Sequence, residues 1–303
     1  MRSGLLGIEH LDRAEIEAIL DRAKAFQPAP NSQFQRLDTL RGQMVVNLFF
    51  EASTRTRTSF EIAAKRLGAD AISITASGSS VSKGESLVDT LNTLAAMRPD
   101  AIVMRHAASG APHFLARYLN TPIINAGDGT HEHPTQALLD ARTILDRRPT
   151  LEGLRVAIIG DIQHSRVARS DMHLLSKFGA ETVLCGPAAL LPPELEKLAP
   201  NVSLTSDLRE AIHGADVIMM LRVQLERQHE ATFAAGEYFQ FYGLRLDHME
   251  LAKPDVIVMH PGPINRGREI SSEVADSQRS VILNQVENGI AVRMAVLERI
   301  LRN

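Results

Sequence analysis

The sequence predicts an α/β protein with two doubly wound parallel-sheet domains, joined by helices, and an active site in the cleft between them. Short apolar runs alternate with amphipathic segments along the 303 residues, as in parallel sheets with helical crossovers. A chain of this length is long for one core, so two domains are expected. Polar residues gather just after the apolar runs, where parallel strands end and ligands bind.

Composition excludes several classes of protein. The net charge of −3 argues against general affinity for nucleic acid. The single cysteine, Cys185, excludes an internal disulfide and fits a reducing cytoplasm. No apolar run approaches the roughly 18 residues of a membrane span, and residues 1–17 lack a signal-peptide pattern. We therefore expect a cytoplasmic protein without nucleic-acid or membrane partners, in which a local basic site holds any anionic ligand.

The first predicted helix has Ile16, Ile19, Leu20 and Ala23 on one face and ends before Pro28. Nine strand-like apolar runs follow, with helical patterns between most of them. These runs are 44–50, 71–75, 101–104, 122–125, 155–160, 182–185, 216–221, 255–259 and 281–284.

The domain boundary is predicted in the polar segment 147–153, which breaks one helix and precedes a fresh strand. The domains are therefore expected to be 1–148 and 149–285. The amphipathic segment 286–303 is expected to return and pack on the first domain.

The stretch 53–57, Ser-Thr-Arg-Thr-Arg, directly follows the strand 44–50 and opens a helical pattern that reaches Leu67 and is closed by Gly68. Helix N-termini attract anions, and arginine matches phosphate oxygens. The stretch is therefore a candidate phosphate site.

An ordinary capped helix is the alternative, because Thr58 and Glu61 fit a capping box. If Arg55 and Arg57 are both helical, their side chains point about 200° apart. One phosphate is then held by one of them, and we favour Arg55, with Arg57 in a supporting role.

The segment 75–86 is long, small and polar, which is typical of a flexible surface loop. The functional alternative is a mobile flap that carries Lys83 to an anion. Ser86 with Asp89 is expected to cap the following helix.

His133 and Gln136 lie one turn apart at the start of a helix whose first position suits Pro134. Simple helix initiation explains this pattern, but both side chains could also touch one small polar ligand. His131 and His133 are poor candidates for a metal pair, because their spacing is not that of a His-x-x-x-His helix site.

Other common chemistries lack support. Gly160 opens a dinucleotide-like turn, but Ile162 stands where the second glycine should be, and no Walker A sequence occurs. Cys185 lies in an apolar run and is expected to be buried and inert. No Gly-x-Ser-x-Gly elbow appears. We expect catalysis by positioning and electrostatics, with no cofactor and no metal.

Candidate residues share one position, after the predicted strands. Besides 53–57 and His133, the candidates include the pair Arg105 and His106, which follows the run 101–104. The others are Arg166, Arg222 and the segment 260–268. Ligands of open α/β sheets bind outside the carboxyl ends of the strands, so this distribution predicts an active site between the domains.

Together these motifs resemble the aspartate and ornithine carbamoyltransferases along essentially the whole chain. Ser53 to Arg57 is similar to the family's carbamoyl-phosphate motif, and Arg105 and His133-Pro134-Thr135-Gln136 match as well. The His-Cys-Leu-Pro and Ser-Met-Gly motifs of ornithine enzymes are missing. Residues 219–224 and 260–267 instead resemble the aspartate-specific branch. Arg268 departs from the family pattern and is therefore assigned no substrate contact, and a substrate contact of Arg266 is left open.

The resemblance implies the chemistry of the carbamoyl-phosphate site. Arg105 and His133 would contact the carbonyl oxygen, and Gln136 with the Gly262 and Pro263 backbones would contact the amino group. The implied phosphate ligands are Ser53, Thr54, Arg55 and Thr56.

The resemblance also implies that Arg166, Arg222 and Gln224 hold aspartate, whose two carboxylates need such cations. Lys83, and Ser79 with it, would reach into a neighbouring subunit of a homotrimer and help to bind aspartate. Arg55, Lys83, Arg105 and His133 would be the catalytic residues. The implied reaction gives N-carbamoyl-L-aspartate and phosphate, an early committed step of pyrimidine biosynthesis.

Three alternatives remain: a carbamoyltransferase for another amino acid such as ornithine, a catalytically silent scaffold, and, more remotely, a nicotinamide-binding protein. Association with regulatory chains or dihydroorotase is equally open.

Overall fold

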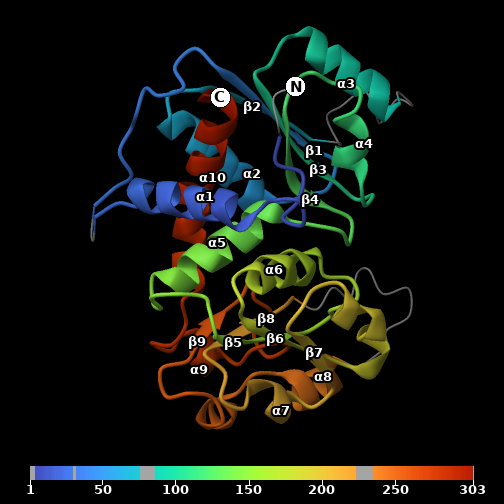
Figure 1. Cartoon of the computed structure of the whole chain (residues 1–303), viewed down its shortest axis with the longest axis vertical. Helices are drawn as coiled ribbons and strands as arrows, with labels where there is room; N and C mark the ends of the chain where they lie inside the picture. Colours follow the sequence, from blue (N-terminus) through green and yellow to red (C-terminus); the bar gives the residue numbers. More distant parts are fainter. Residues whose placement is uncertain (1–3, 30–31, 76–85, 223–234, 303) are drawn as a thin grey trace. The chain divides into compact units, whose positions relative to one another are not determined.

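The computed structural model describes residues 4–29, 32–75, 86–222 and 235–302. The chain divides into two compact units. Unit 1 comprises Met1–Arg142 with Glu287–Asn303, and unit 2 comprises Thr143–Val286. Each unit is built around one parallel sheet with helices (Figure 1), which confirms the predicted fold class. The chain leaves unit 1 within one helix and returns to it within another.

Unit 1 contains a four-stranded sheet in the order β2-β1-β3-β4, with every described pair parallel. The strands are β1 (Met44–Phe49), β2 (Asp70–Thr75), β3 (Ala101–His106) and β4 (Ile123–Asp128). The helices are α1 (Arg13–Phe26), α2 (Thr54–Arg66), α3 (Leu87–Ala96), α4 (Ala111–Leu115), α5 (Pro134–Leu145) and α10 (Ile282–Arg302), the last two shared with unit 2.

The core of unit 1 lies on the faces of this sheet. Apolar residues of α3 and α4 pack with Leu48, Ile102 and Met104 of the strands into one buried cluster. Helix α10 reaches the N-terminal part of the chain, because Arg22 of α1 pairs with Glu298. Unit 1 is therefore assembled from segments at both ends of the sequence.

Unit 2 contains a five-stranded parallel sheet in the order β7-β6-β5-β8-β9. The strands are β5 (Arg155–Ile159), β6 (Glu181–Cys185), β7 (Val202–Thr205), β8 (Val217–Met220) and β9 (Ile257–Met259). The helices are α6 (Arg166–Lys177), α7 (Leu208–Ile212), α8 (Ala235–Tyr242) and α9 (Ser272–Ala275), with the 3-10 turns η3 (Ala188–Leu190), η4 (Pro193–Lys197) and η6 (Leu246–Glu250).

One predicted strand is wrong, and one strand of the structure was not predicted. The run 281–284 lies at the start of α10, where buried Ile282 and Gln285 recur at helical spacing. Strand β7 was missed, because Val-Ser-Leu-Thr is too polar and too short to stand out as an apolar run.

The predicted Thr58–Glu61 capping box was also wrong. The N-cap of helix α2 is Ser53, five residues before Thr58, and its hydroxyl accepts a hydrogen bond from the N–H of Thr56. The predicted end of α2 at Leu67 and Gly68 is confirmed. Gly68 adopts φ +83°, a conformation that favours glycine and stops the helix. The expected cap of α3 is confirmed, with Ser86 accepting from the N–H of Asp89.

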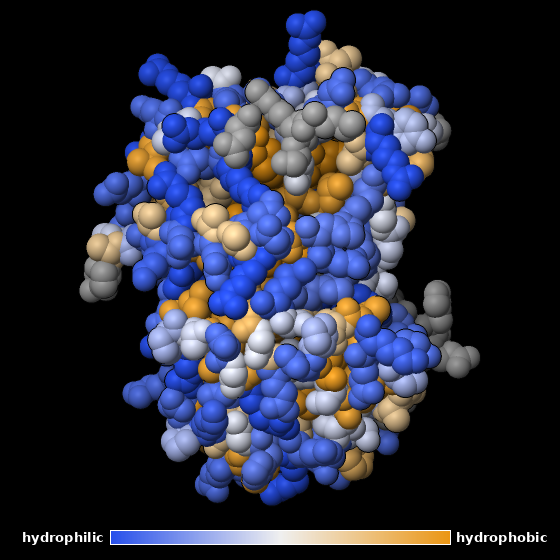
Figure 2. Space-filling view, viewed as in Figure 1, coloured by the Kyte–Doolittle hydropathy of each residue, from blue (hydrophilic) through white to orange (hydrophobic). Residues whose placement is uncertain are grey.

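The surface seen in Figure 2 is mainly hydrophilic, with apolar residues scattered between charged ones. Among the described residues, no helix is both long enough and apolar enough to span a membrane.

Cys185 ends β6 inside the core of unit 2, and burial raises the pKa of its thiol to about 12. The thiol therefore stays protonated and unreactive at pH 8. We expect no labelling of the native protein by a thiol reagent over minutes, and full labelling in denaturant, followed by mass spectrometry. Fast labelling of the native protein would contradict the burial of Cys185.

Candidate active site

In unit 1 the candidate residues lie where the strand order reverses. The chain runs from β1 to β2 on one side and then crosses to β3 and β4 on the other. The carboxyl ends of β1 and β3 are adjacent, because Phe49 is paired with Arg105 and the Phe50 N–H donates to the Arg105 carbonyl at 2.9 Å. Such a reversal is the usual ligand crevice of an open α/β sheet.

The start of α2 supplies backbone donors at this point. Thr54, Arg55 and Thr56 form its first turn behind the Ser53 cap, so their N–H groups lie at the positive end of the helix. Arg57 lies in the same helix, so it and Arg55 point in different directions. The arrangement can hold one phosphate.

Arg105 is held by Glu51, a residue that the sequence did not single out. Its Nη2 lies 2.6 Å from Glu51 Oε1, and its Nη1 donates to the Ala126 carbonyl at 3.3 Å. Both side chains are largely buried, so the pair is weakly screened. An oxyanion offered to Arg105 therefore competes with Glu51 for the guanidinium.

The loop before His133 is tied to the N-terminal segment. The Glu132 carboxylate accepts hydrogen bonds from the backbone N–H of Ile8, at 2.8 and 2.9 Å, and of Glu9 at 3.1 Å. Gly7 packs so closely that a Cβ there would lie 2.4 Å from Glu132 Oε1. Buried His133 then precedes Pro134, the first residue of α5 as predicted.

Asp128 is the last residue of β4, where the same loop begins, and it is fully buried. Burial favours the neutral acid, but hydrogen bonds from His131, from Asn125 and from the Gly110 N–H outweigh burial and lower the pKa of Asp128. The Asp128 hydrogen bond in turn raises the pKa of His131. Ligand-type atoms of Asp128, His131 and His113 lie within 4.8 Å of one another, and the first two already pair at 3.0 Å.

In unit 2 the strand order reverses between β5 and β8. Arg166 is the first residue of α6, after β5, and Arg222 follows β8. Gly160 at the end of β5 has φ +150°, and a Cβ there would lie 2.7 Å from that of Leu221. Close packing of the two strand ends therefore explains the glycine that resembles a dinucleotide motif.

The 260–268 loop is fixed by a buried pair that the sequence did not reveal. The Gly262 N–H donates to His260 Nδ1 at 2.8 Å, so the proton lies on Nε2, which faces Glu269 Oε1 at 3.2 Å. The same carboxylate oxygen accepts from the Asn265 N–H at 2.9 Å. The pair thus sets the path of the backbone at Gly262 and Pro263.

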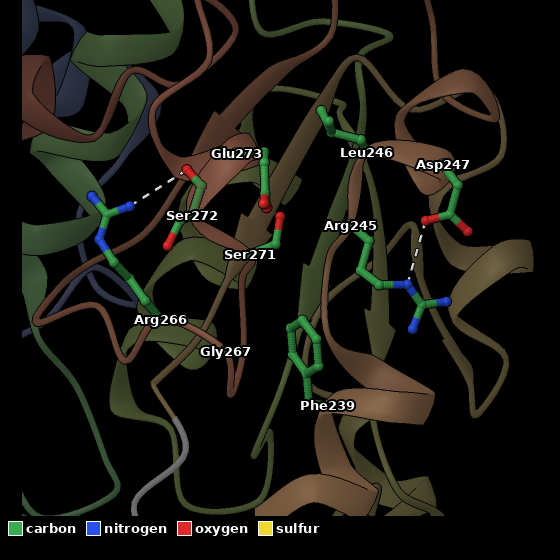
Figure 3. A pocket seen from close by; sticks show the side chains of 9 residues that line it. All are labelled: Phe239, Arg245, Leu246, Asp247, Arg266, Gly267, Ser271, Ser272 and Glu273. Atoms are coloured by element: carbon green, nitrogen blue, oxygen red, sulfur yellow. Dashed lines mark hydrogen bonds and ion pairs between the residues drawn. The ribbon is translucent and has the colours of Figure 1, made fainter.

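A separate pocket of about 630 Å³ opens in unit 2 (Figure 3). Arg245 and Arg266 stand on either side of Phe239 and Ser271. Arg266 forms a two-pronged ion pair with Asp276, at 2.7 Å from each Nη. Since its fork already holds a carboxylate, we assign Arg266 no substrate contact.

Three predicted site residues, Ser79, Lys83 and Gln224, lie outside the described residues. The structure brings the other candidates to the carboxyl ends of two sheets, one set in each unit. Glu51, Glu132 and Glu269 were missed. Only Glu132, next to His133, had a local signal in the sequence.

His131→Asn should remove one component of the pH dependence of stability. Because the folded-state pKa of His131 is raised from 6.5, the charged pair contributes stability that is fully present below that pH and is lost as the pH rises through the raised pKa. We expect the loss in free energy of unfolding on substitution to be larger at about pH 6 than at about pH 9, in urea titrations. Equal losses at both pH values would contradict this role.

Comparisons with known proteins identify the family of the chain. The model of the aspartate/ornithine carbamoyltransferase carbamoyl-P binding domain matches residues 4–146, and that of the Asp/Orn binding domain matches residues 152–300. The chain is 82% identical to the aspartate carbamoyltransferase catalytic subunit of Solibacter usitatus, over 99% of this chain and 100% of that one. It is 58% identical to the aspartate carbamoyltransferase catalytic subunit of Syntrophotalea carbinolica, over 97% of this chain and 93% of that one.

Solved structures of both branches share the fold equally well. Ornithine carbamoyltransferase from Pyrococcus furiosus has a TM-score of 0.87 and 31% identity, covering 98% of this chain and 96% of that one. Aspartate transcarbamoylase from Trypanosoma cruzi, in complex with carbamoyl aspartate and phosphate, has a TM-score of 0.87 and 32% identity, covering 98% and 95%. The chain therefore belongs to the aspartate/ornithine carbamoyltransferase family.

Proposed function

We propose that this chain transfers the carbamoyl group from carbamoyl phosphate to the amine of L-aspartate, giving N-carbamoyl-L-aspartate and phosphate. The observation that carries this proposal is the placement of cations. Helix α2 and Arg105 meet at the strand-order reversal of unit 1, and Arg166 and Arg222 flank that of unit 2. The substrates bring a phosphate and two carboxylates, which these groups match.

Each of the two domains is proposed to bind one substrate. We assign carbamoyl phosphate to residues 1–148, with 286–303 packing back on them, and aspartate to residues 149–285. The phosphate would lie at the start of α2, on Ser53, Thr54, Arg55 and Thr56. Gln136 and the Gly262 and Pro263 backbones would take the amino group.

Aspartate would be held by Arg166, Arg222 and Gln224, with Lys83. Ser79 and Lys83 are proposed to come from a neighbouring subunit of a homotrimer, so that sites are shared. The protein would act in the cytoplasm, in an early step of pyrimidine biosynthesis. We propose a regulatory chain or dihydroorotase as the further partner, since the relatives carry the name catalytic subunit.

The reaction needs no covalent intermediate with the protein. The amine attacks the carbonyl carbon, a tetrahedral oxyanion forms, and phosphate leaves and accepts the amine proton. Arg105 and His133 would stabilise the oxyanion, and one such donor contributes roughly 10²–10³ in rate. Orientation of two anionic substrates contributes more, with effective molarities of about 10⁵ M or above. As the oxyanion forms, it would draw Arg105 away from Glu51.

Two of the alternatives, an ornithine carbamoyltransferase and a catalytically silent scaffold, would require different residues. An ornithine enzyme would need acidic groups for the side-chain ammonium, whereas arginines follow β5 and β8. A silent scaffold need not keep Arg55, Arg105 and His133 together. The relative with 82% identity carries the aspartate enzyme's name, which favours aspartate.

We expect the purified full chain to release phosphate from carbamoyl phosphate with L-aspartate and not with L-ornithine. The two amino acids are assayed in parallel, with a no-acceptor control. Phosphate release with ornithine alone would show that ornithine, and not aspartate, is the acceptor. Release with neither amino acid would favour the silent scaffold.

Arg55→Ala should weaken carbamoyl-phosphate binding about 100-fold or more, because two charge-assisted hydrogen bonds to phosphate are lost. Lys65→Ala is the matched control, since Lys65 is a cation of the same helix that pairs with Glu61 at 2.9 Å. Affinity is measured by calorimetry and folding by circular dichroism. A folded Arg55→Ala variant with normal affinity would contradict the assignment.

A further inference from the structure

Helix α5 carries a buried carboxylate next to a proposed ligand of carbamoyl phosphate. Gln136 and Asp140 are four residues apart and therefore share one face of α5. The Gln136 Nε2 lies 3.1 Å from Asp140 Oδ1 and 3.2 Å from Oδ2. Both side chains are buried, with Asp140 only 1% exposed.

This contact decides which way the Gln136 amide faces. A carboxylate only accepts hydrogen bonds, so it must be met by the NH₂ end of the amide. The other end, Oε1, then points away from Asp140 as an acceptor. The amino group of carbamoyl phosphate is a donor and needs such an acceptor.

Arg293 of α10 provides a positive charge for Asp140. It is 4% exposed, donates from Nη1 to the Gly289 carbonyl at 2.9 Å, and stacks over the Phe60 ring at 5.1 Å. Burial lowers the pKa of Arg293 to about 9, while the attraction of Asp140 opposes that shift. The Arg293 guanidinium is therefore a cation whose charge attracts the buried Asp140 carboxylate.

We propose that Asp140, with Arg293 as its counter-charge, is a positioning residue that orients the Gln136 amide so that Oε1 accepts from the amino group of the carbamoyl phosphate. The proposal rests on the proposed function and adds a source of selectivity. An acyl phosphate with a methyl group in place of the amino group has no donor for Oε1, so the arrangement selects carbamoyl phosphate.

The test compares carbamoyl phosphate with acetyl phosphate, a probe of nearly the same shape that lacks the amino group. The dissociation constants of both are measured by calorimetry for the wild type, Asp140→Asn and a control, Glu298→Gln. The neutral amide of the first variant can meet either end of Gln136, so the orientation is no longer fixed. Glu298 lies on α10, like Arg293, and pairs with Arg22 of α1. Its described ion pairs involve no proposed site residue.

We expect the wild type to bind carbamoyl phosphate more tightly than acetyl phosphate. In Asp140→Asn the ratio of the two dissociation constants should fall about five- to tenfold. The affinity for acetyl phosphate should stay the same, and Glu298→Gln should keep the full preference. If Asp140→Asn does not fold, Asp140→Ser, which leaves more room, is measured in its place. Arg293→Lys, which keeps the charge, should retain more of the preference than Arg293→Met.

Equal weakening of both ligands would indicate a merely structural role and would overturn the proposal. So would an unchanged preference in the Asp140 variants, or no preference in the wild type, while carbamoyl transfer to aspartate is intact. If the wild type neither binds carbamoyl phosphate nor transfers its carbamoyl group, the proposed function fails first and the role of Asp140 falls with it.

Discussion

The parallel pairing of β1 with β3 is the constraint on which the proposed carbamoyl-phosphate part of the site depends. Because Phe49 is in register with Arg105, the turn that opens α2 and the guanidinium of Arg105 leave the sheet at the same level. A shift of one residue would turn the Arg105 side chain to the opposite face of the sheet. The buried apolar residues of both strands prevent that shift, so the core fixes the chemistry above it.

Carboxylates, and not only cations, organise the candidate site. Glu51 restrains Arg105, Glu132 anchors the loop before His133, and Glu269 with His260 sets the path of the 260–268 backbone. Each is paired with a donor that would otherwise be mobile or unsatisfied. An anion-binding site built in this way keeps its donors oriented before substrate arrives, which lowers the cost of reorganisation during reaction.

The sequence was sufficient for the features that depend on neighbouring residues. The apolar runs predicted the two parallel sheets, Ser86 and Pro134 predicted helix starts, and Gly68 predicted a helix end. It was insufficient where the partner is remote. Glu132 bonds to Ile8, 124 residues away, and Glu51 to Arg105, 54 residues away. The position of Glu132 beside His133 draws attention to that residue, but no neighbouring residue identifies either remote partner. Strand β7 owes its existence to pairing with β6 rather than to its own polar sequence.

The path of the chain has a further consequence for how this protein family could diversify. Unit 2 is one continuous segment, Thr143–Val286, inserted into unit 1, which is assembled from both ends of the sequence. Arg166 and Arg222 both lie in that insert. An exchange of that insert, whose two borders each lie within a helix, would replace both arginines together with the 260–268 loop, whereas residues 53–56 and Lys83 would stay in the rest of the sequence.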